Sequence, residues 1–528
     1  MKIVLAAVPL INTRVPPLSL ASIQAYMEKE GHEVKSFDFN IDTYHAVTDD
    51  LKQYWTYYKG FQWNDNSHFE NYIYPNIIGK NLPYWTERIL SEKPDVVGIS
   101  VTGTPAGRIL AQELKRQCPS IKIVIGGPSC SKSFNDPEKQ PCDIYDVVVH
   151  NEGEVTFAEL IREYEKTNVF KAVPGASVLG SNGEVIFGGL REVQMNLDDF
   201  PTPNFDHFDF NRYVDAEDPA STKKEIPYFS SRGCPARCNF CMDYKLWDLR
   251  YRQKSPERIV DEMETLSKKY GIKDFMLIEL IFNGHMTKMR EMLKILNARN
   301  LGFRFWGHGR IDPRLDFETI KLLKDVGFFW FIFGLESGSD KMLKLMRKGY
   351  NVETADRVLS TMKDVGLWCS VNVIVGFPGE TWDDYLETIL FVYKHRGAIA
   401  NEPSLASCMA IPGSDIYLYP EKFGIKSSKD TNFDTIRWES VDGENNYTVR
   451  EFRKEFMNYV FKQIQFCWIK DKQVIKNFDI SEMPNPYEVF KMSEDGLFRP
   501  EVYQAVAESK RLRVQNYTRP HQGIPNLV

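Results

Sequence analysis

The 528-residue sequence has little that would mark a membrane, secreted or nucleic-acid-binding protein. No apolar stretch approaches the ~20 residues that a transmembrane helix needs. The 66 basic and 72 acidic residues give a net charge of −6, so no general basic field for nucleic acid is expected. The apolar N-terminal run is short and has no A-x-A-like site, so we expect a buried strand there. Nine cysteines, an odd count without a secretory signal, argue against a disulfide framework. We therefore expect a cytosolic protein without a membrane span.

The composition is that of an ordinary globular chain. Hydrophobic residues make up 43% and charged residues 26%. The length predicts about three domains at roughly 150 residues each. The 10 Trp, 25 Tyr and 34 Phe suit large cores or a roomy apolar pocket.

The first 195 residues alternate between strand-like and helix-like patterns. Continuous Val/Ile strands separated by helices indicate a Rossmann-like, doubly wound parallel sheet in an α/β fold. A polar, aromatic stretch at Asp49–Tyr84 interrupts the alternation as an insertion. The expected elements are, in order, Lys2–Val8, Leu18–Glu30, Glu33–Phe39, Asp95–Val101, Ala106–Gln117, Ile121–Ile125, Asp146–Val149 and a helix over 154–166.

Three cysteines stand close together after the short apolar strand Ile226–Ser230. Cys234, Cys238 and Cys241 form a C-x3-C-x2-C run. Thiolates are the usual ligands of iron–sulfur clusters, and a cubane normally takes four. Three thiolates would leave one iron open to a small molecule. A structural zinc site wants four ligands, and no second cysteine pair lies downstream, so a 4Fe–4S cluster is favoured over zinc.

This run resembles the radical S-adenosylmethionine (SAM) superfamily, whose pattern is CxxxCxΦC. Phe240 occupies the aromatic position before the last cysteine. The resemblance implies that the open iron binds the amino and carboxylate groups of SAM. One electron from the cluster then cleaves SAM to methionine and a 5′-deoxyadenosyl radical. It also implies a one-electron donor such as flavodoxin or ferredoxin.

Six further strand–helix units follow from residue 226. Ser255-Pro256 is typical of a helix N-cap followed by proline at the first helical position. Six such units predict a partial (β/α)6 barrel, the fold of the radical SAM family. In such barrels the chemistry gathers at the carboxyl ends of the strands.

Residues at those strand ends are the candidate SAM contacts. By resemblance, Glu279 meets the SAM amino group and Glu336, in GLESGSDKML, accepts the ribose hydroxyls. Arg310 could pair with the SAM carboxylate as a bidentate donor, or form a salt bridge at the rim. Ile374 and Gly376 lie in a run similar to the adenine-binding GxIxGxxE motif. That run departs from the motif, with Asn372 in place of the first glycine and Glu380 one residue late.

The N-terminal region, placed ahead of this barrel, resembles the cobalamin-binding domain of many radical SAM enzymes. Ligands of doubly wound sheets lie at the carboxyl ends of the strands. The candidate cobalamin contacts at three such ends are Thr102, Gly103, Thr104, Gly126, Gly127, Pro128, Glu152, Gly153 and Glu154. Glycine lets the backbone approach a ligand closely. A Rossmann-like domain that binds nothing would need the same glycines for tight turns, and this alternative stays open.

One signature of cobalamin proteins is missing. The D-x-H-x-x-G motif, whose histidine ligates cobalt in methionine synthase-like proteins, does not occur. The four N-terminal histidines, which we expect on the surface or satisfied in the core, are His32, His45, His68 and His150. Any cobalamin here would lack this lower ligand. A second cluster on Cys118, Cys130 and Cys142 is the less favoured interpretation, because cysteine is more often a small buried hydrophobe.

These patterns predict four regions. They are the cobalamin-binding domain at 1–195, a linker at 196–225, the radical SAM barrel with its cluster at 226–412, and a mainly helical region at 413–528 that shapes the substrate pocket. The resemblance implies an enzyme that transfers a methyl group from methylcobalamin to an unactivated carbon of a small-molecule or peptide substrate. Cyclisation, rearrangement or oxidation without methyl transfer, as in the anaerobic magnesium-protoporphyrin oxidative cyclase, is the alternative. A non-catalytic cobalamin or SAM sensor is a second alternative, and methylthiotransferase chemistry is less favoured.

Overall fold

A computed structural model describes residues 1–130, 144–180, 182–243, 250–426, 435–467, 480–493 and 495–517. The chain divides into two compact units. The first comprises Met1–Pro235 and Asp243–Trp306, and the second comprises Ala236–Met242 and Gly307–Val528. Each unit is described by itself. The predicted domain boundaries stay a prediction.

The first unit contains a seven-stranded sheet with the order β2-β1-β3-β4-β5-β6-β7. Its strands are β1 (Lys2–Ala7), β2 (Glu33–Asp38), β3 (Val96–Ser100), β4 (Lys122–Gly126), β5 (Val147–Val149), β6 (Ala176–Leu179) and β7 (Val185–Phe187). The first five pair in parallel with one another, as predicted for a doubly wound sheet. The last two are antiparallel and were not predicted, because their apolar runs are only three or four residues long.

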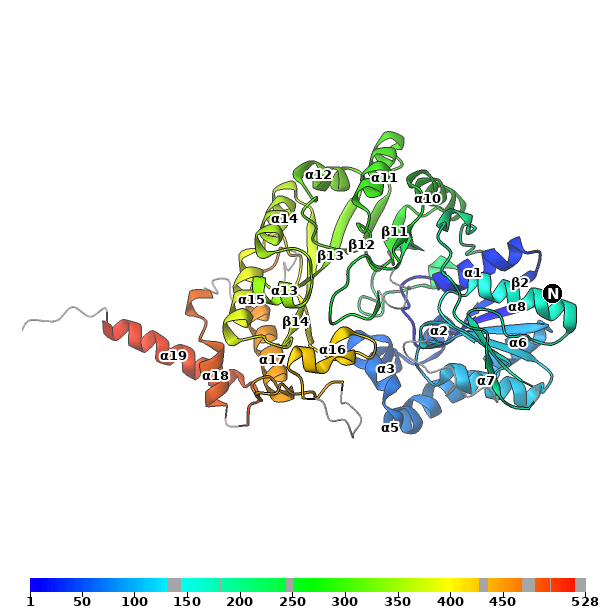
Figure 1. Cartoon of the computed structure of the whole chain (residues 1–528), viewed down its shortest axis with the longest axis horizontal. Helices are drawn as coiled ribbons and strands as arrows, with labels where there is room; N and C mark the ends of the chain where they lie inside the picture. The colour runs from blue at the N-terminus through cyan, green and yellow to red at the C-terminus, as the bar shows by residue number, and fades with distance from the viewer. Residues whose placement is uncertain are drawn as a thin grey trace, which may run out of the picture. The chain divides into compact units, whose positions relative to one another are not determined.

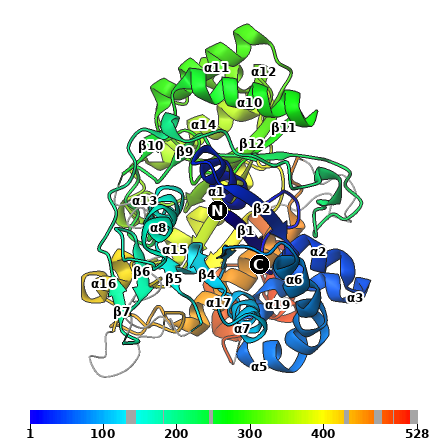
Figure 2. The ribbon, with the colours of Figure 1, turned by 90° about the vertical axis from the view of Figure 1, so that its right-hand side faces the viewer.

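Helices cover both faces of this sheet. The helices are α1 (Leu18–Lys29), α2 (Phe39–Ala46), α6 (Gly79–Ser91), α7 (Ala106–Gln117) and α8 (Glu154–Thr167). Helices α1 and α8 lie together on one face, and α6 and α7 lie together on the other (Figure 1 and Figure 2). Strand β1 is buried along Ile3–Ala7, as expected for a central parallel strand covered on both sides.

The predicted insertion is a run of short helices. They are α3 (Asp49–Lys52), η1 (Gln53–Trp55), α4 (Tyr57–Gly60), η2 (Phe61–Asn64), α5 (Asn66–His68) and the π-helix η3 (Phe69–Ile78). Trp55 and Trp63 are buried with their rings edge to face, so the aromatic residues of this stretch form a small core.

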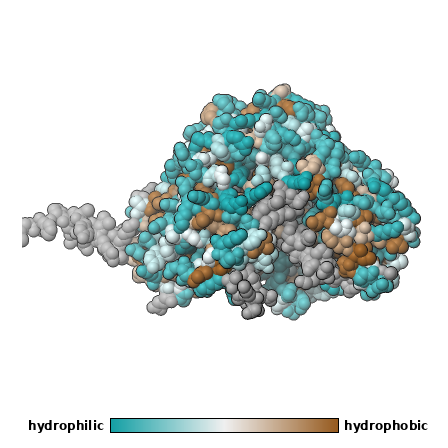
Figure 3. Space-filling view, in the orientation of Figure 1, coloured by the Kyte–Doolittle hydropathy of each residue, from teal (hydrophilic) through white to brown (hydrophobic). Residues whose placement is uncertain are grey.

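The first unit also holds the start of the second βα series. Its elements are η4 (Pro128–Cys130), η6 (Leu197–Asp199), η7 (Phe210–Arg212), β8 (Ile226–Tyr228), β9 (Ser231–Arg232), β10 (Arg252–Gln253), α10 (Pro256–Tyr270), β11 (Asp274–Leu277) and α11 (Met286–Arg299). Strands β8 and β11 are parallel. Helix α10 begins as predicted, because the Ser255 Oγ accepts a hydrogen bond from the Arg258 N–H. The surface over α10 and α11 is mostly hydrophilic in Figure 3, as expected for amphipathic helices.

Strand β12 (Arg304–Gly309) runs across the boundary between the units. In the second unit, β13 (Phe328–Glu336), β14 (Trp368–Val375) and β15 (Ser404–Ser407) pair in parallel. The helices of this unit are α12 (Phe317–Asp325), α13 (Asp340–Leu345), α14 (Val352–Val365), α15 (Trp382–Lys394), α16 (Asp415–Leu418), η8 (Pro420–Phe423), α17 (Tyr447–Gln463), η9 (Ile480–Glu482), α18 (Pro486–Met492) and α19 (Pro500–Tyr517). The described C-terminal region is therefore helical, as predicted. No helix in the described ranges is both long and apolar enough to span a bilayer.

Candidate cofactor sites

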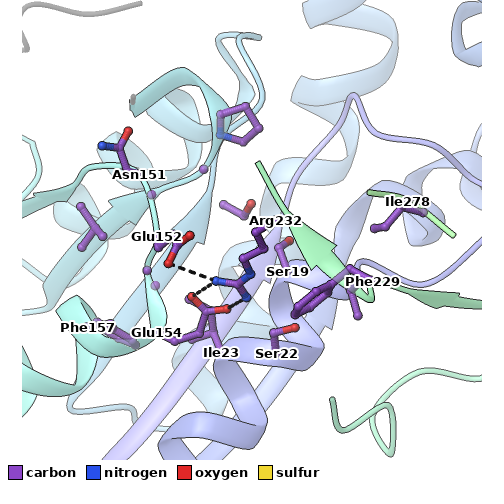
Figure 4. Close-up of a pocket in the computed structure, with 18 of the residues that line it drawn as sticks. Ser19, Ser22, Ile23, Asn151, Glu152, Glu154, Phe157, Phe229, Arg232 and Ile278 are labelled. Atoms are coloured by element: carbon purple, nitrogen blue, oxygen red, sulfur yellow. Dashed lines mark hydrogen bonds and ion pairs between the residues drawn. The ribbon is translucent and has the colours of Figure 1, made fainter. Parts of the chain in front are cut away.

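A cavity of about 490 Å³ lies in the first unit at the carboxyl ends of the parallel strands. Residues from β1, β3, β4, β5 and α1 form its mainly apolar wall, and these include Leu5, Ile23, Ile99 and Val124. Residues around β8, β9 and β11, including Phe229, Gly233 and Glu279, complete the wall. Figure 4 shows side chains from α1, the loop after β5 and the strand β9 directed toward this space. Strand β9 precedes the segment Cys234–Cys241, which we call the cysteine loop. Its size and apolar lining are typical of a cofactor or ligand site.

Two of the three predicted strand-end segments line the cavity. Gly126–Pro128 and Glu152–Glu154 are in its wall. Gly127 has a φ of +114°, and a Cβ there would stand 2.6 Å from the Val101 carbonyl oxygen, so this turn requires glycine. A Cβ on Gly153 would stand 2.8 Å from Ile23 Cδ1. The glycines thus allow close packing at the cavity wall.

The third predicted segment, Thr102–Thr104, is not among the described residues that line the cavity. The Thr102 Oγ1 hydroxyl donates to the Leu10 carbonyl at 2.9 Å, and the Thr104 Oγ1 hydroxyl donates to the Pro9 carbonyl at 2.5 Å. These threonines therefore hold the loop after β1. Any contact of this segment with cobalamin stays a prediction.

The carboxylates of Glu152 and Glu154 pair with arginines. Arg232 Nη2 bonds Glu154 Oε1, and Arg252 Nη1 lies 3.1 Å from Glu152 Oε2. Burial opposes ionisation of Glu154, but the Arg232 guanidinium outweighs it and lowers the pKa of that carboxyl. The sequence alone does not indicate these pairs, because Arg232 and Glu154 are 78 positions apart.

Glu279 lies in the cavity wall with one oxygen unpaired. Its Oε1 accepts a hydrogen bond of 2.6 Å from the Ser230 hydroxyl. Its Oε2 is buried and has no hydrogen-bond partner within the described residues. Burial raises the pKa of Glu279 to about 7. A buried, unpaired carboxyl oxygen in a cavity wall suits a ligand that brings its own donor.

Asn239 holds the part of the cysteine loop that lies in Ala236–Met242 of the second unit. The Asn239 side chain donates to the Leu345 carbonyl at 2.7 Å, and its backbone N–H donates to the Met346 carbonyl at 3.1 Å. The Cys241 N–H donates to the Cys238 carbonyl at 3.1 Å, so the last two cysteines share a turn. Phe240 packs against an apolar cluster that includes Met346. Asn239 was not predicted as a site residue, although it lies in the sequence between Cys238 and Cys241.

None of the three cysteines of the loop is in a disulfide. Cys238 is buried, whereas Cys234 and Cys241 are partly exposed. Their chemistry fits an iron–sulfur cluster. No three His, Cys, Asp or Glu side chains in the described ranges are arranged as a metal site, so the assignment depends on the motif.

Cys130 and His150 have ordinary structural surroundings. Burial raises the pKa of Cys130 to about 12, so this thiol is neutral. Cys142 lies outside the described residues. The His150 ring nitrogens lie 2.7 Å from the Cys130 carbonyl oxygen and 2.9 Å from Ser177 Oγ, as expected for a satisfied core histidine.

A buried ion pair stands close to the cysteine loop. The Lys348 ammonium lies 3.2 Å from Glu336 Oε1 and 5.8 Å from the centroid of the Phe240 ring. Burial alone would lower the pKa of Lys348, but the Glu336 carboxylate outweighs this effect and raises it. Glu336 itself has a φ of +67°, a conformation that an L-residue adopts only when its surroundings hold it.

Arg310 lies near the residues that follow Lys348 of this ion pair. Gly349 leaves space for its guanidinium, since a Cβ there would stand 2.8 Å from Arg310 Nη2. Arg310 also interacts electrostatically with Tyr350, whose hydroxyl donates to the Leu335 carbonyl at 2.8 Å. The second unit thus brings the predicted residues Arg310 and Glu336 together.

The turn after β14 is bound to α17 rather than exposed. The Gly376 N–H donates to Glu380 Oε2 at 2.8 Å, and Arg453 Nη1 donates to the same oxygen at 2.7 Å. A Cβ on Gly376 would stand 2.3 Å from Arg450 Cγ. Ile374 packs against the apolar cluster that contains Met346. The predicted adenine contacts of Ile374 and Gly376 stay a prediction.

Residues 228–392 match the Radical SAM superfamily, so the chain carries a radical SAM domain. An uncharacterized methyltransferase of Pyrococcus horikoshii is 28% identical over 308 residues, which are 57% of this chain and 64% of that protein. The anaerobic magnesium-protoporphyrin IX monomethyl ester cyclase of Rubrivivax gelatinosus is 28% identical over 400 residues, which are 73% of this chain and 70% of the cyclase. The chain thus spans just under two thirds of the first relative.

A solved structure has the same fold. The radical SAM methyltransferase TsrM from Kitasatospora setae, with cobalamin and a [4Fe-4S] cluster bound, superposes with a TM-score of 0.58 at 18% identity. The superposition covers 82% of this chain and 81% of TsrM.

Proposed function

We propose that this chain is a cobalamin-dependent radical SAM enzyme, and that it transfers a methyl group to an unactivated carbon. The observation that carries the proposal is the shared cavity of the first unit. The strand-end segments Gly126–Pro128 and Glu152–Glu154 line it together with Gly233, which precedes the first cysteine, and with Glu279. One cavity is therefore in contact with both predicted cofactor sites.

The proposal assigns a role to each group of residues. Cys234, Cys238 and Cys241 would hold the 4Fe–4S cluster, and Glu279, Arg310 and Glu336 would hold SAM. The glycine-rich loops and the apolar cavity wall would hold the corrinoid. When bound, the three cofactors supply a 5′-deoxyadenosyl radical and a transferable methyl group. The protein excludes water and holds the reacting groups in line.

The proposal extends to the fold and the partners. Strands β8 and β11–β15 would form a partial (β/α)6 barrel at residues 226–412. In the sequence, this barrel follows the cobalamin-binding domain at 1–195 and its linker, and precedes the helical region at 413–528. A one-electron donor such as flavodoxin or ferredoxin would reduce the cluster. The substrate would be a small molecule or a peptide.

Two variants test the two cofactor sites separately. We expect Cys238→Ala to lose iron and sulfide after anaerobic reconstitution while it still binds hydroxocobalamin. Gly127→Ala should weaken hydroxocobalamin binding and keep its iron, because of the positive φ and the contact with Val101. Gly183→Ala is the matched control, since Gly183 has a φ of +81° and open space around its Cβ position. Equal loss of iron and corrinoid in Cys238→Ala would count against separate sites.

Cyclisation or oxidation without methyl transfer is the second candidate, because the Rubrivivax gelatinosus relative is a cyclase. S-adenosylhomocysteine separates the two reactions. A methyltransferase forms it from SAM in amounts that depend on added hydroxocobalamin. A cyclase would form 5′-deoxyadenosine and no S-adenosylhomocysteine.

A further inference from the structure

The arginine two residues before Cys234 is bound by the loop that lines the cavity. Arg232 bonds Glu154 and lies 3.5 Å from Glu152 Oε2 through its Nη1. Arg252, its partner across the β9–β10 pair, bonds Glu152 and donates to the Gln194 carbonyl at 2.8 Å. In Figure 4 the Arg232 side chain reaches between the two glutamates. We call Arg232, Arg252, Glu152 and Glu154 the clamp.

The clamp is almost fully removed from water. The side chain of Arg252 is 1% exposed, and those of Glu154, Arg232 and Glu152 are 8%, 10% and 11% exposed. The rings of Phe200 and Phe229 lie 4.8 Å and 4.6 Å from the Arg232 guanidinium carbon. Buried charges are tolerated only when they are paired in good geometry, so these side chains have little freedom to rearrange.

Each side of the clamp leads to a different cofactor site. The two glutamates flank Gly153 in the cavity wall. Arg232 is followed by Gly233, also in the cavity wall, and then by Cys234. The clamp therefore links the loop after β5 to the segment that leads into the cysteine loop. Ion-pair networks of this kind carry coupling between sites, and such coupling acts equally in both directions.

We propose that Arg232 is a positioning residue that couples corrinoid binding in the cavity to cluster binding at the cysteine loop. The inference rests on the proposed function, because it requires both ligands. The measured quantity is the ratio of two hydroxocobalamin dissociation constants, one for protein with the cluster and one for protein stripped of iron. In the wild type the two dissociation constants should differ at least fivefold, which is at the lower end of typical coupling between sites.

The decisive variant is Arg232→Met with Glu154→Met. Removing one member of a buried ion pair leaves an unpaired charge, whereas replacing both with apolar residues is often neutral for stability. We expect the double variant to unfold at a temperature close to that of the wild type and to bind hydroxocobalamin equally with and without the cluster. The control is Arg162→Met with Glu30→Met. Arg162 lies in α8 and Glu30 is the residue that follows α1, and their ion pair of 2.8 Å is not in the cavity wall. These two substitutions remove the same charges as the clamp double variant.

The outcomes are distinct. A ratio near one in the wild type, or a ratio unchanged in the clamp double variant, overturns the inference and leaves the clamp with a purely structural role. A wild type that binds no hydroxocobalamin overturns the proposed function itself. A control variant that loses the ratio would show that any lost ion pair has this effect, and would also overturn the inference.

Discussion

Glu279 gives a quantitative prediction, because protonation of its carboxyl competes with binding of the SAM amino group. With a pKa of about 7, the carboxyl is largely neutral at pH 6 and ionised at pH 8. The amino group of SAM, which the open iron is expected to bind through its nitrogen, would donate an N–H to the ionised form. Binding below pH 7 therefore has to release a proton, and linkage predicts that the affinity for SAM rises about tenfold from pH 6 to pH 8.

The test uses Glu279→Gln, which keeps the shape and removes the charge. SAM dissociation constants are measured by anaerobic equilibrium dialysis with cluster-loaded protein at several pH values. The variant should bind SAM roughly 10- to 100-fold more weakly at pH 8, as expected for the loss of a hydrogen bond to a charged group. Its affinity should also lack the tenfold rise. A pH dependence that is the same in both proteins would refute the assigned role of Glu279.

The same carboxyl predicts a stability effect without any ligand. Its pKa in the folded protein is above the unfolded value of 4.5, so the native state binds the extra proton between pH 4.5 and about 7. Stability from this group is present at low pH and is lost as the pH rises through this window, by up to ~3 kcal/mol. Glu279→Gln should therefore gain thermal stability relative to the wild type between pH 5 and pH 8. A constant difference between the two proteins would contradict the raised pKa.

The remaining predictions concern the second unit. Arg453→Met leaves Glu380 as a buried carboxylate without its ion-pair partner, and should lower the free energy of unfolding by about 3–5 kcal/mol. The unfolding temperature should fall and hydrogen exchange in α17 should become faster. An unchanged exchange rate would contradict this. Lys348→Met should lower the reduction potential of the cluster, measured by EPR titration without SAM, because it removes a buried cation near the cysteine loop. Glu336→Gln should raise that potential, and the double variant should restore it; equal potentials in all three variants would refute the charge effect.

Local patterns predicted the parts of the molecule that depend on local chemistry. The apolar run after Lys2 formed the central strand β1, and Ser255-Pro256 began α10. Gly127 adopted the positive φ that a tight turn at a cavity wall requires. Each of these depends on a few neighbouring residues, which a sequence displays directly.

The parts that could not be predicted depend on contacts between distant residues. Nothing near Arg232 in the sequence indicates Glu154, and nothing near Glu380 indicates Arg453, 73 positions away. The same limit explains why the positions of Thr102 and Thr104 were not predicted. Their hydroxyls donate to the carbonyls of Leu10 and Pro9, which are more than 90 positions earlier in the sequence. Hydrogen bonds and ion pairs of this kind follow from tertiary packing, which overrides the local pattern.

The proposed chemistry requires that the three thiolates hold a cluster that breaks SAM with one electron. The most direct measurement is product analysis by mass spectrometry after anaerobically reconstituted, reduced protein is incubated with SAM. We predict 5′-deoxyadenosine from the wild type and none from Cys238→Ala. Iron-loaded, reduced wild-type protein that leaves SAM intact would contradict the account.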